Sequence, residues 1–432
     1  MFLRSFKLFV AALAAALVLL SVGCGNGEPA PAPTGLAVSA GEASATVSWD
    51  MTDGVEYWLF FGPSSIAPTT TSSMQGWFGL PGGNVLLKAT SPYVVTGLPD
   101  GLSYSFSVNA RTNGGPGGPG STAVTVTPRI AGTSWLAGST VPATTDLRSV
   151  TFGATTGTTT TVPVNTYVAA GTGGAIYSSL DGATWSAVNG ASSRNINAAA
   201  YFGTFKLVGD DGLVLLSSDA ASWTAQTSGT TQNLYALASN SLNLNVAVGA
   251  NGTIISSTDG INWTAATSSG TTRDLYAVTY AAYGSGLWLA VGAGGTMVQS
   301  TDGLTWTSVA SNTQADLRGI VYGTVVSPTS STSTVILSTS EFVAVGAGGT
   351  VLSSSDGANW LAQTLQGAGN LNAIACGTQY VIAGAGGKIF ISADGASWTA
   401  TTPVTSQNLY AVARGALAYS AVGAAGTNLL SK

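Results

Sequence analysis

The chain has 432 residues and a formal net charge of −5, and only 7% of its residues are charged. Histidine is absent, which removes the usual imidazole base and the commonest metal ligand, and no basic cluster is present that would bind nucleic acid. Gly, Ser, Thr, Ala and Val dominate the composition, which favours short strands and tight turns over helices. We therefore expect an all-β protein of two or three domains that uses neither a cofactor nor a metal ion.

Residues 1–23 are typical of an export signal. Arg4 and Lys7 precede an apolar stretch that is too short for a comfortable membrane span. The stretch ends in LLSVGC, which resembles the lipobox of bacterial lipoproteins. The resemblance implies cleavage before Cys24 and acylation of that cysteine, which would anchor the exported protein to a bacterial membrane. Gly25 favours the outer membrane, and an ordinary signal peptide followed by an incidental cysteine is the alternative.

Residues 24–35 form a Pro-rich spacer, and residues 36–129 alternate like a small β-sandwich. Within GLPDGLSYSFSVNA, one face at period two carries Leu98, Tyr104, Phe106, Val108 and Ala110. The segment resembles the fibronectin type III family, which implies a tyrosine corner at Tyr104 and a core position for Trp49. Such a module is expected to act as a spacer or as a binding platform.

Residues 130–432 contain seven repeats, each opening with Asn or Asp, an aliphatic residue, a variable residue, a small residue and another aliphatic or small residue. The openings start at Asp146, Asn195, Asn233, Asp274, Asp316, Asn370 and Asn408. A second strand, a glycine hairpin, a third strand and a fourth strand follow in each repeat, which predicts a seven-bladed β-propeller. The seventh repeat ends before its fourth strand, and GTSWLAGS, residues 132–139, is expected to supply that strand.

Six repeats carry the motif Ser-x-Asp-Gly-x-x-Trp between their third and fourth strands, which we call the aspartate turn. The aspartate side chain can accept hydrogen bonds from backbone N–H groups, glycine can take positive φ, and tryptophan can pack between blades. The aspartates are Asp181, Asp219, Asp259, Asp302, Asp356 and Asp394. The motif resembles the Asp-box of BNR-repeat proteins, which include sialidases, glucanases, sortilin-like receptors and photosystem II assembly factors. That resemblance implies a structural role; Ala220 replaces the glycine once, so that turn is expected to be strained or differently shaped.

Few carboxylates of the propeller remain for catalysis, namely Asp210, Asp211 and Glu341. Glycoside hydrolysis requires two carboxylates that flank one bond, whereas Asp210 and Asp211 are neighbours in one turn and Glu341 belongs to another blade. Two carboxylates in one turn also fall short of a calcium site. The sequence therefore predicts a protein that is not an enzyme, with a sialidase-like or glucanase-like glycoside hydrolase as an alternative.

The variable residue of each repeat lies where the innermost strand begins, at the mouth of the central channel. These seven mouth residues are Arg148, Asn197, Tyr235, Tyr276, Arg318, Asn372 and Tyr410. Tyrosine faces can stack on sugars or apolar groups, and arginine can bind carboxylates bidentately. The simpler alternative is that these side chains only fill the channel and bond to one another. We expect a scaffold that binds an envelope protein or a glycan here, and a carbohydrate-binding propeller is the narrower alternative.

Overall fold

The protein is described by a computed structural model, in which the chain divides into two compact units, Met1–Ile130 and Ala131–Lys432. The described residues are 29–68, 74–139, 141–156, 163–240, 242–282, 284, 286–328, 336–416 and 418–431. The expected signal sequence and Cys24 lie outside them. The described residues form an all-β protein, as the composition predicts, and none of their helical turns is long and apolar enough to cross a membrane.

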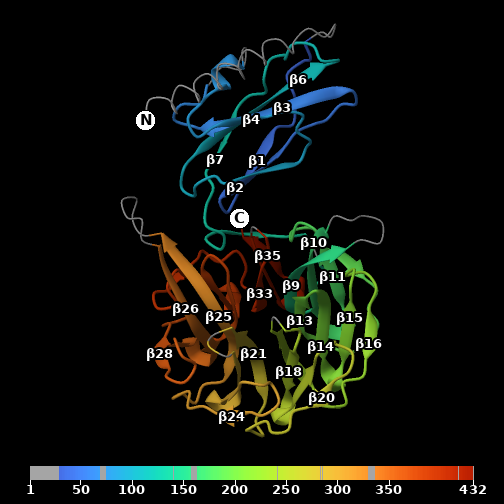
Figure 1. Cartoon of the computed structure of the whole chain (residues 1–432), viewed down its shortest axis with the longest axis vertical. Coiled ribbons are helices and arrows are strands. Elements are labelled where there is room, and N and C mark those ends of the chain that lie inside the picture. Colours follow the sequence, from blue (N-terminus) through green and yellow to red (C-terminus); the bar gives the residue numbers. More distant parts are fainter. Residues whose placement is uncertain are drawn as a thin grey trace. The chain divides into compact units, whose positions relative to one another are not determined.

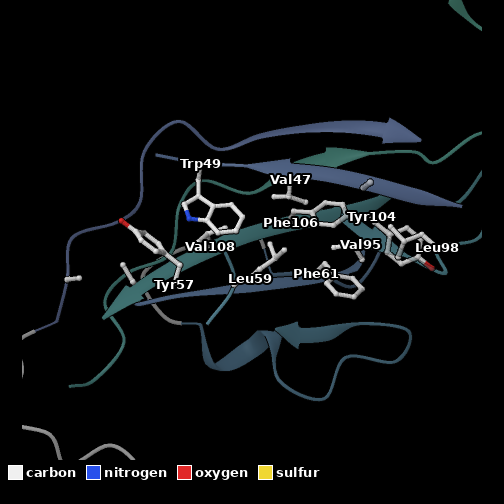
Figure 2. Packing of buried hydrophobic residues seen from close by; sticks show 14 residues of the cluster. Val47, Trp49, Tyr57, Leu59, Phe61, Val95, Leu98, Tyr104, Phe106 and Val108 are labelled. Carbon is white, nitrogen blue, oxygen red and sulfur yellow. The ribbon is translucent and has the colours of Figure 1, made fainter. Parts of the chain in front are cut away.

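The first unit is a β-sandwich of two antiparallel sheets (Figure 1). One sheet has the order β1 (Ala37–Gly41), β2 (Ser44–Ser48) and β5 (Tyr93–Thr96), and the other has the order β4 (Asn84–Leu86), β3 (Val55–Pro63), β6 (Tyr104–Thr112) and β7 (Val124–Val126). The residues at period two in β6 face the core with Trp49, which is 5% exposed (Figure 2). The predicted alternation of that strand is therefore confirmed.

Two features of the sandwich are not apparent from its sequence. A short 3-10 turn, η1 (Gln75–Trp77), covers the outer face of β3, where Phe60, Met74 and Trp77 form a second apolar cluster. The expected spacer also contacts the sandwich before residue 36, since Pro29 forms a β-bridge with Arg111 and Ala30 is buried in the main core. The sandwich therefore begins some residues earlier than its strand pattern indicates.

The second unit contains seven four-stranded antiparallel sheets, the blades of a β-propeller. The innermost strands are β9 (Leu147–Thr156), β13 (Ile196–Phe202), β17 (Leu234–Ser239), β21 (Leu275–Ala281), β25 (Leu317–Pro328), β29 (Leu371–Cys376) and β33 (Leu409–Arg414). Each contacts the innermost strand of the next blade, and β33 contacts β9, so the ring is closed around a common centre (Figure 1).

The other strands of each blade follow outward in chain order. The second strands are β10 (Pro163–Gly171), β14 (Thr204–Gly209), β18 (Asn245–Gly249), β22 (Leu287–Gly292), β26 (Ile336–Gly346), β30 (Tyr380–Gly384) and β34 (Tyr419–Gly423). The third strands are β11 (Ile176–Ser179), β15 (Val214–Ser217), β19 (Ile254–Ser257), β23 (Met297–Ser300), β27 (Thr350–Ser354), β31 (Ile389–Ser392) and β35 (Asn428–Ser431). The outermost strands of blades 1–6 are β12 (Ser186–Val188), β16 (Thr224–Gln226), β20 (Thr264–Ala265), β24 (Thr307–Ser308), β28 (Leu361–Thr364) and β32 (Thr399–Ala400).

The outermost strand of the last blade comes from the beginning of the unit, as the sequence predicts. This strand, β8 (Trp135–Ala137), pairs with β35 in the register Leu429 to Ala137 and Ser431 to Trp135. Trp135 is 4% exposed, and its indole N–H donates to the carbonyl oxygen of Gly132 at 2.8 Å. Because the first and last segments share one sheet, β35 has no unpaired edge.

The glycine hairpins between second and third strands are short 3-10 turns. They span η2 (Thr172–Gly174), η3 (Asp210–Gly212), η4 (Ala250–Gly252), η5 (Ala293–Gly295), η6 (Ala347–Gly349), η7 (Ala385–Gly387) and η8 (Ala424–Gly426). The central residue of each turn has positive φ, even where it is Asp211 at 51° or Ala425 at 54°. The glycine before each turn has extended backbone instead, and a Cβ atom there would collide with the carbonyl oxygen of the Asn or Asp that opens the repeat.

Candidate functional site

The antiparallel order gives the propeller two different faces. The starts of the innermost strands and the glycine hairpins share one face, which we call the hairpin face. The aspartate turns and the connections between first and second strands share the opposite one, the aspartate face. The insertions that start at Ala154 and Thr324 belong to such connections, in the hairpins β9–β10 and β25–β26, so the described parts of both lie toward the aspartate face.

Every mouth residue is the extra residue of a β-bulge. In blade 1, Leu147 pairs with Gly171 and Ser149 pairs with Ala170, so Arg148 has no partner in the ladder. The same single-residue shift occurs at the remaining mouth residues, Asn197, Tyr235, Tyr276, Arg318, Asn372 and Tyr410. A bulge redirects a side chain and frees it from the alternation of the strand. The sevenfold bulge explains why the residue type varies widely here, while the preceding position is always Leu or Ile and the following one is always a small residue.

Two arginine–asparagine pairs connect adjacent blades around the mouth, blade 1 with blade 2 and blade 5 with blade 6. Nη1 of Arg148 donates to Oδ1 of Asn197 at 2.8 Å, and Nη1 of Arg318 donates to Oδ1 of Asn372 at 3.0 Å. Each asparagine then donates to a backbone carbonyl of the following blade, Asn197 to Leu234 at 3.1 Å and Asn372 to Leu409 at 2.8 Å. The order Arg, Asn, Tyr therefore occurs twice around the mouth, with Tyr276 between the two triplets.

The two triplets differ in what surrounds them. The side chain of Asn197 also donates to Oδ1 of Asp210 at 2.8 Å, and blade 6 has Ala385 where blade 2 has this aspartate. The rings of Tyr235 and Tyr276 are 5.8 Å apart and inclined by 51°. Burial raises the pKa of Tyr276, and the negative charges of Asp274 and Asp316 add to that effect, so its hydroxyl is a neutral donor at physiological pH.

A cavity opens on one side of the mouth. It has a volume of about 410 Å³ and is lined by Arg148, Asn197, Tyr235, Tyr276, Asp316 and Arg318. Asn372 and Tyr410 do not line it, although they belong to the same ring. All seven mouth side chains are half-buried. The structure thus brings five of the seven predicted residues together in one cavity, with an arginine at either end and two tyrosines between them.

The Asn or Asp that opens each repeat links two blades. Its side-chain oxygen accepts a hydrogen bond from the hairpin of the preceding blade, as Asn195 does from Gly173 at 2.9 Å. The ring-closing member of this series is Asp146, which accepts from the backbone N–H of Ala425 at 3.0 Å. Only an acceptor oxygen is required for this bond, which explains why asparagine and aspartate interchange at this position.

The aspartate turns form the hydrogen bonds that their sequence predicts. In blade 3, Oδ1 of Asp259 accepts from the backbone N–H groups of Ile261 and Asn262, both at 2.8 Å. The N–H groups of Asn262 and Ile261 lower the pKa of this carboxyl well below its usual range. Asp219 accepts equivalent bonds, so the turn with Ala220 keeps the common shape, and the expected strain is present as a φ of 60° at Ala220.

The tryptophans of these turns differ in the hydrogen bond that the indole N–H forms. Nε1 of Trp263, Trp360 and Trp398 donates to the carbonyl oxygen of the motif glycine at 3.0–3.1 Å. Nε1 of Trp185, Trp223 and Trp306 is buried and has no hydrogen-bond partner among the described residues. The motif tryptophan is thus buried in five turns and partly buried in the sixth, at Trp398, and the N–H bond is an addition in half of them.

The carboxylates that sequence reasoning kept for catalysis lie apart. Asp210 is bonded to Asn195 and Asn197, and Asp211 forms an exposed ion pair with Arg194 at 3.5 Å, both on the hairpin face. Glu341 lies in β26, near Gly395 of blade 6. Within the described part of the chain, no group of three or more His, Cys, Asp or Glu side chains could bind a metal ion.

The chain matches no known protein family and no curated protein at a significant level. Among solved structures, it is similar to YCF48 bound to D1 peptide, with a TM-score of 0.52 and 18% identity over 69% of this chain and 96% of that chain. It is also similar to YCF48 from Cyanidioschyzon merolae, with a TM-score of 0.51 and 16% identity over 69% and 98% of the two chains. The WD40 β-propeller domain of Doa1 has a TM-score of 0.50 and 11% identity over 69% and 97%. At these identities the similarity establishes the β-propeller fold.

Proposed function

We propose that this protein is a non-catalytic scaffold whose propeller binds a segment of another protein at the channel mouth. The observation that carries the proposal is the sevenfold bulge, which directs seven variable side chains to one place and leaves a cavity between Arg148 and Arg318. Guanidinium groups and tyrosine rings are enriched at the centres of protein interfaces. The solved structure of YCF48 bound to D1 peptide supports the proposal, since that protein has a similar fold and binds a peptide.

The proposed setting is the bacterial cell envelope. The LLSVGC segment supports export and acylation at Cys24, preferentially in the outer membrane, and the sandwich then acts as a fibronectin type III spacer between the membrane and the propeller. The strand order of the sandwich and its buried Trp49 support this assignment.

A glycan is the second candidate ligand, favoured by one observation. The tilted pair of Tyr235 and Tyr276 offers aromatic surface inside the cavity, beside the amide of Asn197. Sugar rings can stack on such surfaces while their hydroxyls bond to amides. A sialidase-like or glucanase-like hydrolase would need two carboxylates at one bond, and Asp211 and Glu341 lie near opposite ends of different blades.

Affinity capture from envelope extract, run beside a glycan array, tests the proposal. The bait is the whole chain in detergent, as wild type and as the triple variant Arg148→Ala/Arg318→Ala/Tyr276→Ala. The matched control is Arg194→Ala/Arg273→Ala, because these two arginines are exposed on the same face and do not line the cavity. We expect a protein that wild type and control retain and that the folded triple variant loses. Equal capture by all three would refute binding at the mouth, and a glycan retained instead would select the second candidate.

A further inference from the structure

Glu341 is a half-buried acid at the junction of blades 5 and 6. It lies in β26 opposite Gly323 of β25, where the long β25–β26 hairpin joins the propeller. Its Oε1 atom is buried, accepts no hydrogen bond from any described residue, and lies so close to Gly395 that a Cβ atom there would collide with it. Ionising a carboxyl group at such a place is costly, whereas the neutral acid is tolerated.

The same place is apolar in two other blades. Leu287 and Leu244 stand at the position of Glu341 in blades 4 and 3, each five residues before the first glycine of the hairpin. A Cβ atom on Gly357 would lie 2.7 Å from Leu287, and one on Gly303 would lie 2.9 Å from Leu244, so both leucines pack beneath the aspartate turn of the next blade. Blade 5 therefore places an ionisable side chain where blades 3 and 4 place a leucine, and blade 6 has the uncharged Gln379 at the same position.

The base of the hairpin is attached to blade 6 beside this acid. The hydroxyl of Tyr380 donates to the carbonyl oxygen of Gly323 at 2.9 Å and approaches that of Glu341 at 3.5 Å. The aromatic ring of Tyr380 is also close to Gly395, so the tyrosine, the glycine and the acid share one contact. A change of charge on Glu341 would therefore act directly on the bonds that attach the hairpin.

Three titratable groups interact with Glu341, namely Asp394 in the aspartate turn, Cys376 in β29 and Tyr380 in β30. Tyr322 in β25 interacts with Tyr380. Burial, together with the negative charge of Asp394, raises the pKa of Glu341 to about 7. Burial also raises the pKa of Cys376 to about 11 and the pKa of Tyr380 above its usual range, so both remain neutral. No ion pair joins Glu341 to a cation of the described residues.

We propose that Glu341 is a pH-sensitive latch, whose neutral carboxyl lets the base of the β25–β26 hairpin pack on blade 6 and whose ionised form loosens that contact. The pKa in the folded chain exceeds the usual value of 4.5, so proton binding favours the packed state. This contribution is complete below pH 4.5, is lost as the pH rises to about 7, and does not change further above that. The described base of the β25–β26 hairpin would then be held on blade 6 in an acidic setting and released in a neutral one.

Hydrogen exchange of the full chain at about pH 5.5 and about pH 8, corrected for intrinsic rates, tests the latch. The variants are Glu341→Gln, which keeps the shape without the charge, and Glu341→Leu, which adopts the side chain used in blades 3 and 4. In the wild type we expect the amides of residues 323–325 and 339–341 to exchange several-fold faster at the higher pH, and in both variants this difference should vanish. Asp211→Asn, which removes an exposed carboxylate of the hairpin face, should retain the wild-type response.

Thermal melts supply a second readout. The wild type should melt below Glu341→Gln at about pH 8 and together with it at about pH 4.5, because in neutral solution only the wild type must take up a proton or bury a charged carboxylate when it folds. A pH response of the hairpin amides that persists in both Glu341→Gln and Glu341→Leu would overturn the proposal.

Discussion

The two faces of the propeller use the repeat in opposite ways. On the aspartate face, the side chain of Asp259 and its equivalents serves the backbone, accepting two N–H groups in every turn, and the residue type never changes. On the hairpin face, the bulge removes Arg148 and its equivalents from the ladder, and the residue type changes from blade to blade. In a repeat protein, a side chain that satisfies the backbone is fixed in type, and one that a bulge has released can be used for recognition.

The largest effect is expected from opening the ring, because both faces depend on its closure. Deleting residues 132–139 removes β8 and the buried Trp135, and it leaves β35 as an unpaired edge. Loss of the tryptophan alone should cost roughly 3–5 kcal/mol, and an exposed edge favours aggregation. Differential scanning calorimetry should show a sharply lower melting temperature. An unchanged melt would contradict closure by this strand.

Two aromatic substitutions, one on each face, should differ in how much they lower the free energy of unfolding. Trp360 of an aspartate turn is 6% exposed, and Trp360→Ala should destabilise the propeller by roughly 3–5 kcal/mol. Tyr276 is half-buried at the mouth, and Tyr276→Ala should cost no more than about 1 kcal/mol. Urea unfolding of the two variants measures both values. If Tyr276→Ala were as destabilising as Trp360→Ala, the mouth residues would be a channel plug, and recognition there would lose its support.

The repeat allowed the seven-bladed architecture to be predicted from the sequence. The features that give each face its role, such as the bulges, leave no pattern in the sequence. The period of the motif, its turn residues and the missing last strand specify seven blades and their closure by residues 132–139. The bulge at Arg148 has no such signal. In the sequence, one extra residue in a strand gives the same pattern of apolar and polar residues as a strand whose alternation is shifted by one position. The packing of Trp77 on the outer face of β3 and the burial of the Oε1 atom of Glu341 depend on contacts between segments that are distant in the sequence, and composition and spacing do not predict such contacts.

The smallest effect concerns the one aspartate turn that departs from its motif. Ala220 has a φ of 60°, a conformation that glycine adopts freely and that L-residues with a Cβ atom adopt at a cost. Ala220→Gly should therefore stabilise the propeller by about 1 kcal/mol, even though it adds flexibility to the unfolded chain. Ala221→Gly is the matched control, since Ala221 is exposed and has no positive φ, and it should be neutral or slightly destabilising.

The comparison of Ala220→Gly and Ala221→Gly by chemical denaturation also tests why the motif is fixed. If Ala220→Gly gives no gain, glycine is not required by backbone conformation, and its recurrence in the other turns must come from packing. Packing is an alternative explanation, because a Cβ atom on Gly260 would collide with Lys206 of the preceding blade and one on Gly357 would collide with Leu287. Ala220 is itself 2% exposed, so its methyl group fills space that glycine would leave empty. A gain despite that loss would establish that the backbone, rather than packing, fixes the residue on this face.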